Sequence, residues 1–530
     1  MRSWKRKSYD ELPALSISGR PLRSALATVT AAWMFGIFWM SCITGSQMTS
    51  FYRLLGFGYL AIGIFTAIPY LATLGQVYAA EYVERTGMRK YHFIHFAILH
   101  RLLWLAIAAV PLVLGRGRGA IVAFLVIYGI SSVLAHMSTL SWYTWMGDLI
   151  PRRIRGRYFA NRMLLTIPIQ IVTVTIVGLM LDMLMGQTPG PVLGLLDKLG
   201  LQELPHRLAE LGRTPMRQLY FICAVFALGA VSGTMDICLF FRLREIIPRR
   251  PAAPAPGPRH DDAPPSPGSV LLAPVHMVAQ SLKDKGFRHY ALYAATIAFS
   301  QTVCDQFFWL NSREKVGFGN FGSNVLFMVI GTLASMGLAR LWGKLIDGWG
   351  RRPVLILGTL GTVISPIGWF FMRPGEAFLW ERFALGAGSC VIGGGMWAAV
   401  GLAQTSILLG FGESKGRGKY MAAAAVVMAI GGAAGGLAGS GIASLFARLP
   451  NARMLVGPFE WNNYHMTFLA SSLVRASSLL WLIGMPEPGA RQVGDMVRDL
   501  LINAYANVKT RLSWPLRPVS PHMDDKDKLE

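Results

Sequence analysis

The sequence predicts an all-α membrane protein, with twelve transmembrane helices arranged as two pseudo-symmetric six-helix bundles. Three observations support this: the composition, twelve long apolar runs, and loop patterns that recur in both halves. Of 530 residues, 53% are hydrophobic and 15% charged, and mean hydropathy is +0.42. A soluble domain carries about 25% charged residues. Most of this chain must therefore face lipid or other buried helices.

The chain carries a formal net charge of +23, which in a soluble protein would suggest a nucleic-acid partner. Nucleic-acid binding requires the basic residues to gather on one face, whereas here they lie in short segments between apolar runs. We expect no such partner. The cysteines lie within apolar runs and show no C-x-x-C spacing, so we expect no disulfide framework, metal site or cofactor. They are Cys42, Cys223, Cys238, Cys304 and Cys390.

Twelve apolar runs approach the length of about 20 residues that a membrane span needs. In lipid each must be helical, because the backbone finds no water to bond. The first six begin near Ser24, Leu55, His95, Ala120, Met163 and Leu219. The second six begin near Tyr290, Val325, Val354, Phe383, Met421 and His465. Polar sequence separates the basic start MRSWKRK from the first run, so we expect a retained helix rather than a cleaved signal.

The basic residues orient the chain in an inner or plasma membrane. With the N-terminus inside, most of the 51 Lys and Arg residues fall in cytoplasmic segments, as the positive-inside rule requires. Both termini are then cytoplasmic. The predicted segments are a cytoplasmic stretch (1–23), an N-terminal bundle (24–242), a Pro-rich cytoplasmic linker (243–288), a C-terminal bundle (289–485) and a tail with an amphipathic helix (486–530).

Two loop patterns recur in the two halves. Residues 84–89 and 347–352 both read acid-x-x-Gly-x-basic, and the two copies are 263 positions apart. Residues 155–158 and 417–420 both read Arg-Gly-basic-Tyr, 262 positions apart. Two independent patterns at nearly one offset indicate internal duplication. Because each half has six helices, the repeats are parallel and related by an axis along the membrane normal.

The sequence resembles the major facilitator superfamily over nearly the whole chain. The segment Gly343-Lys-Leu-Ile-Asp347-Gly-Trp-Gly350-Arg351-Arg352 is similar to the family's loop signature between helices eight and nine. The first-half copy departs from that signature, with Ala80 for the first Gly and Glu84 for Asp.

A second, shorter similarity lies in the tenth helix. Arg382-x-x-x-Gly386-x-Gly388 resembles a family pattern usual in helix four. The Gly- and Pro-rich fifth helix of drug-proton antiporters is absent from residues 163–185, so that subgroup is not expected. Residues 431–441 of the eleventh helix are rich in glycine and alanine, which favours close helix packing. A direct binding role is the alternative.

The repeated loops suggest a conformational latch. A carboxylate beside the start of another helix is favoured by the helix dipole, by about 0.3–1 kcal/mol. The hypothesis pairs Asp347 with the start of helix five, and Glu84 with the start of helix eleven. The alternative is that these charges only set topology and cap helices. The latch set is Gly343, Asp347, Gly350, Arg351, Arg352, Glu84, Gly87, Arg89, Arg155, Gly156, Arg157, Arg417, Gly418 and Lys419.

Polar residues within spans are expensive and are candidates for function. The resemblance implies that helices one, four, seven and ten line a central cavity. The candidates for solute binding or coupling there are Asp305, His136, Gln301, Gln47, Arg382, Glu381 and Trp397. Trp142 and Trp145 belong either to this cavity or to an interfacial aromatic belt.

Asp305 is the first choice for a proton- or cation-coupling carboxylate, with simple hydration near the headgroups as the alternative. His136 either relays protons or is a hydrogen-bonded packing residue. Four other charged residues lie on helices that the resemblance puts away from the cavity, where we expect interhelical pairs or snorkelling. They are Asp182, Asp236, Arg101 and Arg475.

The sequence contains no Gly-rich phosphate loop, no H-E-x-x-H motif and no Ser-His-Asp set on suitable turns. We therefore expect neither an enzyme nor an ATP-driven pump. The leading interpretation is a monomeric secondary active transporter of a small solute, proton-coupled and working by alternating access. The alternative is a non-transporting module that assembles or delivers a lipid, pigment or cell-wall intermediate. A closed polar cavity would favour the first, and a wide apolar cavity open to lipid the second.

Overall fold

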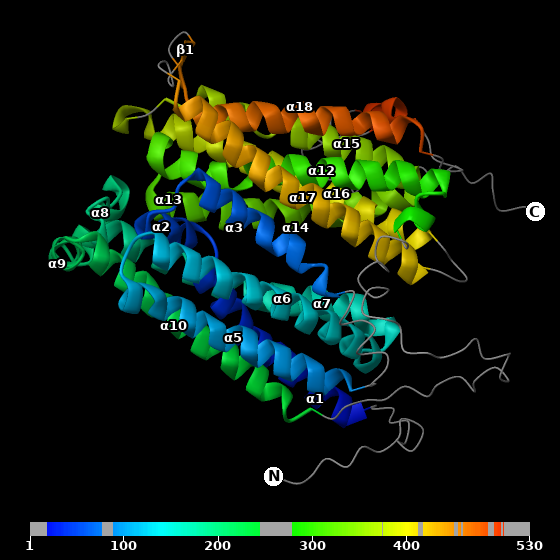
Figure 1. Cartoon of the computed structure of the whole chain (residues 1–530), viewed down its shortest axis with the longest axis horizontal. Coiled ribbons are helices and arrows are strands. Elements are labelled where there is room, and N and C mark those ends of the chain that lie inside the picture. Colours follow the sequence, from blue (N-terminus) through cyan, green and yellow to red (C-terminus); the bar gives the residue numbers. More distant parts are fainter. Residues whose placement is uncertain are drawn as a thin grey trace, which may run out of the picture.

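The computed structural model folds into two layers of long helices that run in roughly the same direction (Figure 1). It describes residues 19–76, 88–243, 278–373, 375–411, 417–449, 454–456, 459–485, 492–499 and 502. Ten of the described helices are long and apolar enough to cross a membrane. The shorter α3 and the more polar α12 complete the set of twelve, which confirms the predicted fold class.

The N-terminal half supplies six spans and two short connecting helices. Its spans are α1 (Gly19–Ile43) with its continuation α2 (Ser46–Leu55), α3 (Tyr59–Ala72), α5 (Arg89–Leu114), α6 (Arg118–Leu149), α7 (Arg152–Leu184) and α10 (Pro215–Phe240). The helices α8 (Gly190–Lys198) and α9 (Glu203–Leu211) connect α7 to α10.

The C-terminal half repeats this plan. It contains α12 (Lys285–Leu310) with the π-helical turn η2 (Asn311–Val316), then α13 (Gly319–Asn324), η3 (Val325–Ile330) and α14 (Gly331–Trp349), which form one rod. It continues with α15 (Arg351–Ile364), η4 (Ile367–Phe371), η5 (Glu376–Phe378), α16 (Leu379–Gly410) and α17 (Arg417–Ala447). The antiparallel hairpin β1 (Met454–Val456) and β2 (Phe459–Trp461) precedes α18 (Asn463–Ile483).

Several helices begin earlier than the apolar runs predicted. α1 begins at Gly19, α5 at Arg89 and α7 at Arg152. Their first turns are basic, and hydropathy does not count a basic turn as part of a span although the helix continues through it. Most of the Pro-rich linker and of the tail lies outside the described residues, so the predicted segment boundaries stay predictions. Residues 493–499 of the tail are helical, and Met496 is buried.

Small residues on α17 set the closest packing in the C-terminal half. A Cβ on Gly435 or Gly439 would lie 2.2 Å from a backbone carbonyl oxygen of α12, that of Phe299 or Val303. Across the halves, a Cβ on Gly63 of α3 would lie 2.6 Å from the hydroxyl of Ser440. Such distances exclude larger side chains and let the helices approach closely. The predicted packing role of this segment is confirmed.

The two ends of the molecule differ, and we name them here. The terminal end is where α1 begins and α18 ends. The distal end is the opposite one, where α2, α8, α9, α13 and the hairpin gather (Figure 1). The halves contact each other mainly through α3 with α17 and through α7 with α13 and η3.

Candidate functional site

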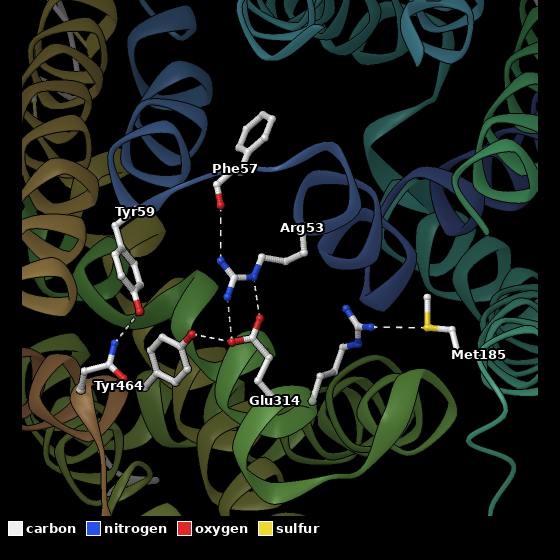
Figure 2. Close-up of polar contacts among 8 residues, drawn as sticks. Arg53, Phe57, Tyr59, Met185, Glu314 and Tyr464 are labelled. Carbon is white, nitrogen blue, oxygen red and sulfur yellow. Dashed lines mark hydrogen bonds and ion pairs between the residues drawn. The ribbon is translucent and has the colours of Figure 1, made fainter. Parts of the chain in front are cut away.

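All hydrogen bonds between the halves, as far as the chain is described, lie at the distal end. The strongest joins α2 to η2. The Arg53 guanidinium donates from Nε and Nη2 to the two carboxylate oxygens of Glu314, at 2.5 and 2.9 Å. The Tyr464 hydroxyl donates to the same carboxylate at 2.6 Å (Figure 2). A two-point guanidinium–carboxylate contact fixes orientation as well as distance.

A second contact joins the end of α7 to the start of α13. The Asp182 carboxylate accepts from the backbone N–H groups of Asn320 at 2.6 Å and Phe321 at 2.8 Å. It also accepts from the Asn320 side-chain amide at 2.9 Å. These N–H groups belong to the first turn of α13, which has no partner within its own helix. A carboxylate of one half therefore caps a helix of the other half.

The third contact centres on Asn324, at the end of α13. Its side-chain amide donates to the Val174 carbonyl at 2.8 Å and to the Gln47 carboxamide at 3.3 Å, and its oxygen accepts from Ser46 N–H at 2.9 Å. Gly45 makes the room: its φ of 86° favours glycine, and a Cβ there would lie 2.8 Å from the Asn324 oxygen. The break between α1 and α2 thus accommodates this asparagine.

We call Arg53, Asp182, Glu314, Asn320 and Asn324 the distal gate. Together they connect two elements of the N-terminal half, α2 and α7, to the segment 314–324. Among the described residues, no comparable contact joins the halves at the terminal end. Within the described residues, polar contacts therefore fasten the two halves at the distal end.

A cavity of about 650 Å³ lies within the N-terminal half, between α1, α5, α6, α7 and α10. Its walls are mainly apolar and aromatic, and three charged side chains line it. Arg101 and Asp236 form an ion pair at 3.6 Å, and the Arg101 guanidinium lies 3.5 Å from the centre of the Trp39 ring. The third is Arg162.

A smaller cavity of about 380 Å³ lies in the C-terminal half. Asp305 and Gln301 of α12, Trp397 of α16 and Arg475 of α18 line it. The Arg475 guanidinium donates to the Thr362 carbonyl at 2.7 Å and lies 5.3 Å from the Trp397 ring centre. Met163 lines both cavities, so they adjoin.

The structure brings together three of the predicted solute or coupling candidates, Asp305, Gln301 and Trp397. The others lie elsewhere. Gln47 belongs to the distal gate contacts, and His136 Nδ1 is 3.0 Å from the Gln76 carboxamide of the neighbouring span. Arg382 donates to the Val316 carbonyl at 2.6 Å, and Glu381 pairs with Arg373 at the distal end.

The two tryptophans of α6 take different positions. Trp142 lines the N-terminal cavity. Trp145 is fully buried between Phe93 and Phe240, with ring centres at 6.1 and 5.9 Å. Neither stands in a belt at the surface of its bundle.

The resemblance implied that the helices of Arg101, Asp236 and Arg475 lie away from a central cavity. All three side chains line a cavity of their own half. Arg101 and Asp236 do form the expected interhelical pair. Arg101 of α5 passes close to Gly233 of α10, where a Cβ would lie 2.7 Å from the Arg101 side chain. Asp182 caps α13 instead.

Arg162 also lines the N-terminal cavity, although the sequence did not predict it as a site residue. The apolar run of the fifth span began at Met163, so the residue before it counted as loop. The structure starts α7 at Arg152, which puts Arg162 three turns inside the helix. The available signal was an arginine directly beside a long apolar run, a position where charged residues are rare.

The predicted latch residues lie at the terminal end. Asp347 is exposed, and no contact with Arg155 or Arg157 is described. Arg155 donates to the Gly147 and Ile150 carbonyls at the end of α6, and Arg352 donates to the Ile483 carbonyl at 2.8 Å.

Other members of the latch set are only partly described. Lys419 donates to the Gln280 side chain at 2.8 Å, and Gly350 has a φ of 100°, which favours glycine. Glu84 and Gly87 lie outside the described residues, and of Arg417 and Gly418 only the helical backbone is described. The latch hypothesis stays a prediction.

Comparison with known proteins gives one family and several structures. A profile of the Major Facilitator Superfamily matches residues 185–436. The nucleoside transporter NupG has a TM-score of 0.57 at 12% identity, over 88% of this chain and 100% of its own. A D-xylose-proton symporter has a TM-score of 0.57 at 13% identity, over 89% and 98%.

A third structure is a bacterial homolog of the human lysosomal transporter Spinster, in an inward-facing and occupied conformation. Its TM-score is 0.56 at 13% identity, over 95% of this chain and 100% of its own. At such identities the likeness concerns the fold. No curated protein matches the sequence.

Proposed function

We propose that this chain, which belongs to the major facilitator superfamily, is a secondary transporter that moves a small solute by alternating access. The observation that carries the proposal is the distal gate, a set of polar contacts that joins the two halves at the distal end. A static scaffold does not need reversible polar contacts between its halves. A gate made of such contacts suits two halves that rock about a central site. The two cavities adjoin at Met163, which supports a site that both halves can reach.

The contact between Asp182 and α13 suggests how the two states are stabilised. The Asp182 carboxylate, near the end of α7, caps the first turn of α13 in the other half. The sequence offers the same pairing at the terminal end, where Asp347 ends α14 and Arg155 and Arg157 begin α7. In the proposed cycle the distal contact breaks as the terminal contact forms. Both contacts join α7 to the continuous helix formed by α13, η3 and α14.

We assign proton coupling to Asp305. It is the carboxylate of the C-terminal cavity, and Arg475 lines the same cavity. Protonation of Asp305 would remove its charge and leave Arg475 uncompensated, which changes the balance of charges that the halves present to each other. Proton binding would thereby favour one of the two states.

The orientation follows from the distribution of basic residues. If both termini are cytoplasmic, the distal gate faces outward and its contacts close the outer end in the described conformation. The apolar walls of the N-terminal cavity are the one feature that suits the alternative of a lipid or pigment delivery factor. A reversible gate is not needed for that role.

The test begins with a thermal-shift screen of the purified protein against classes of small solute, because a ligand stabilises the state that it binds. Each stabilising solute is then tested for saturable counterflow into proteoliposomes. The proposal expects at least one such solute to exchange across the membrane, with empty liposomes as the control. Stabilising solutes that bind but never exchange would contradict it.

A further inference from the structure

Arg162 is a buried cation that shares one nearby carboxylate, Asp236, with Arg101, the residue that forms the ion pair. It is 7% exposed, although it carries a permanent positive charge within a predicted span. Its Nη1 has no hydrogen-bond partner in the part of the chain that the structure describes, and no ion pair to it is found there. A buried charge is ordinarily paired, because an unpaired one loses its hydration without compensation.

Two indole rings hold the guanidinium in place. It lies 4.6 Å from the ring centre of Trp33 on α1 and 5.0 Å from that of Trp142 on α6. Such contacts orient a guanidinium and offset part of its burial. They supply no hydrogen-bond acceptor and no negative charge. The cation is therefore positioned by the two rings, and its one nearby carboxylate is already in an ion pair with Arg101.

The charge balance of the cavity points the same way. Of the described residues that line it, two are arginines and one is an aspartate. Asp236 pairs with Arg101, so Arg162 leaves an excess of one positive charge. The C-terminal cavity is balanced, because Asp305 and Arg475 both line it.

The wall beside Arg162 suits an elongated ligand. Arg162, Thr166 and Gln170 follow one another at four-residue intervals on α7, so they form a row along the cavity. The Thr166 hydroxyl donates to the backbone carbonyls of Arg162 and Met163. No hydrogen bond of the Gln170 carboxamide is described. Most of the remaining lining is apolar or aromatic, and the volume of about 650 Å³ is in the range of small-molecule sites.

We propose that this cavity binds an organic monoanion, whose charged head pairs with Arg162 and whose apolar body lies against the aromatic walls. The inference rests on the proposed transport function, since it names the substrate class for that site. Arg162 is then a binding residue, and the ligand supplies the charge that the protein lacks. A neutral sugar would leave the cation unpaired, and an organic cation would be repelled.

The test compares three probes of one shape on the full-length protein in lipid nanodiscs. They are phenylpropionate, phenylpropionamide and phenylpropylamine, which differ in charge and share one apolar body. Titration calorimetry gives Kd for each. We expect the anion to bind roughly tenfold or more tightly than the amide and the amine. An amide or amine that binds as well as the anion, or an anion with no measurable binding, overturns the proposal.

Substitution then assigns the preference to one residue. Arg162→Gln should abolish the preference for the anion. Arg162→Lys should keep part of it, because lysine retains the charge but lacks the paired N–H donors of the planar guanidinium group. The matched control is Arg207→Gln, since Arg207 is an exposed arginine on α9 that pairs with Glu203. Retention of the anion preference in Arg162→Gln overturns the proposal. If that variant does not fold, the wild-type comparison of the three probes still decides.

The outcomes separate this inference from the proposed function. An anion that binds through Arg162 without counterflow would contradict transport and leave the anion site standing. Counterflow of a neutral or cationic solute, with no anion binding, would do the opposite.

Discussion

Asp305 and Arg475 bring opposite charges to one small cavity, and this pairing is the basis of the proposed coupling. With Asp305→Asn, the side chain keeps its size and loses its proton site. We expect uphill uptake driven by a proton gradient to fall to the level of empty liposomes, while counterflow of the same solute persists because exchange needs no net proton movement. The measurement is uptake into proteoliposomes with and without an imposed gradient.

The matched control is Asp197→Asn on the exposed helix α8, which should leave both activities unchanged. Full gradient-driven accumulation by Asp305→Asn would show that the proton site lies elsewhere.

Individual residues were predictable where sequence spacing fixes a shared helix face. Gln301 and Asp305 are four apart on one helix, so their common cavity follows from the helical period. His136 and Arg382 were not predictable, because their partners, Gln76 and the Val316 carbonyl, come from other helices. Arg162 was missed because a hydropathy run ends at a charge, whereas the helix around it does not.

At the scale of elements, glycines on α17 allow close approach to α12. Gly435→Ala would put a Cβ 2.2 Å from the Phe299 carbonyl oxygen, which forces the helices apart. Overpacking of this kind costs about 1–3 kcal/mol. We expect a lower Tm in detergent, followed by intrinsic fluorescence.

Gly441→Ala lies on the same helix and meets nothing within 4 Å, so it should leave Tm close to that of the wild type. Equal Tm values for the two variants would contradict the packing account of this helix.

The cap that Asp182 places on α13 is a second test for an element. Asp182→Asn removes the negative charge and one acceptor while keeping the shape. The first-turn N–H groups of α13 then lose a charged partner. The free energy of local unfolding of α13 should therefore fall by about 0.5–2 kcal/mol. Hydrogen exchange followed by mass spectrometry should show faster exchange in peptides that cover residues 319–324.

Asp197→Asn again serves as the control, and it should not alter exchange in those peptides. Unchanged exchange in Asp182→Asn would mean that the carboxylate does not hold the start of α13.

The elements themselves were largely predictable, since long apolar runs in lipid have no alternative to helix. Their interruptions were not. The α1–α2 break at Gly45 and the π-helical turns η2 and η3 have no hydropathy signal. The break at Gly45 accommodates Asn324 of the other half. A break whose cause lies on another segment cannot be read from its own sequence.

At the scale of the whole molecule, the duplication was visible in the loops, and the two halves followed from it. The conformation was not, because a transporter sequence encodes at least two states of similar free energy. The distal gate is what distinguishes the described state. The distal gate uses Glu314, Asn320 and Asn324. These residues lie between the seventh apolar run and the eighth, which begins near Val325.

The central claim is that the halves rock, so that the distal end opens as the terminal end closes. It can be tested without knowing the solute, by weakening the gate. Glu314→Gln removes one charge of the Arg53 pair; a loss of roughly 1 kcal/mol would change the ratio of the two states about fivefold. Glu210→Gln, in an exposed pair with Arg213 on α9, is the matched control.

The measurement is the distance between pairs of spin labels in a background without native cysteines. One pair, Arg118→Cys and Ala377→Cys, reports on the distal end, and the other, Ala160→Cys and Lys344→Cys, reports on the terminal end; all four positions are exposed and lie outside the proposed contacts. With Glu314→Gln, a population with a longer distal and a shorter terminal distance should grow. Distal distances that lengthen while terminal distances stay fixed would contradict alternating access.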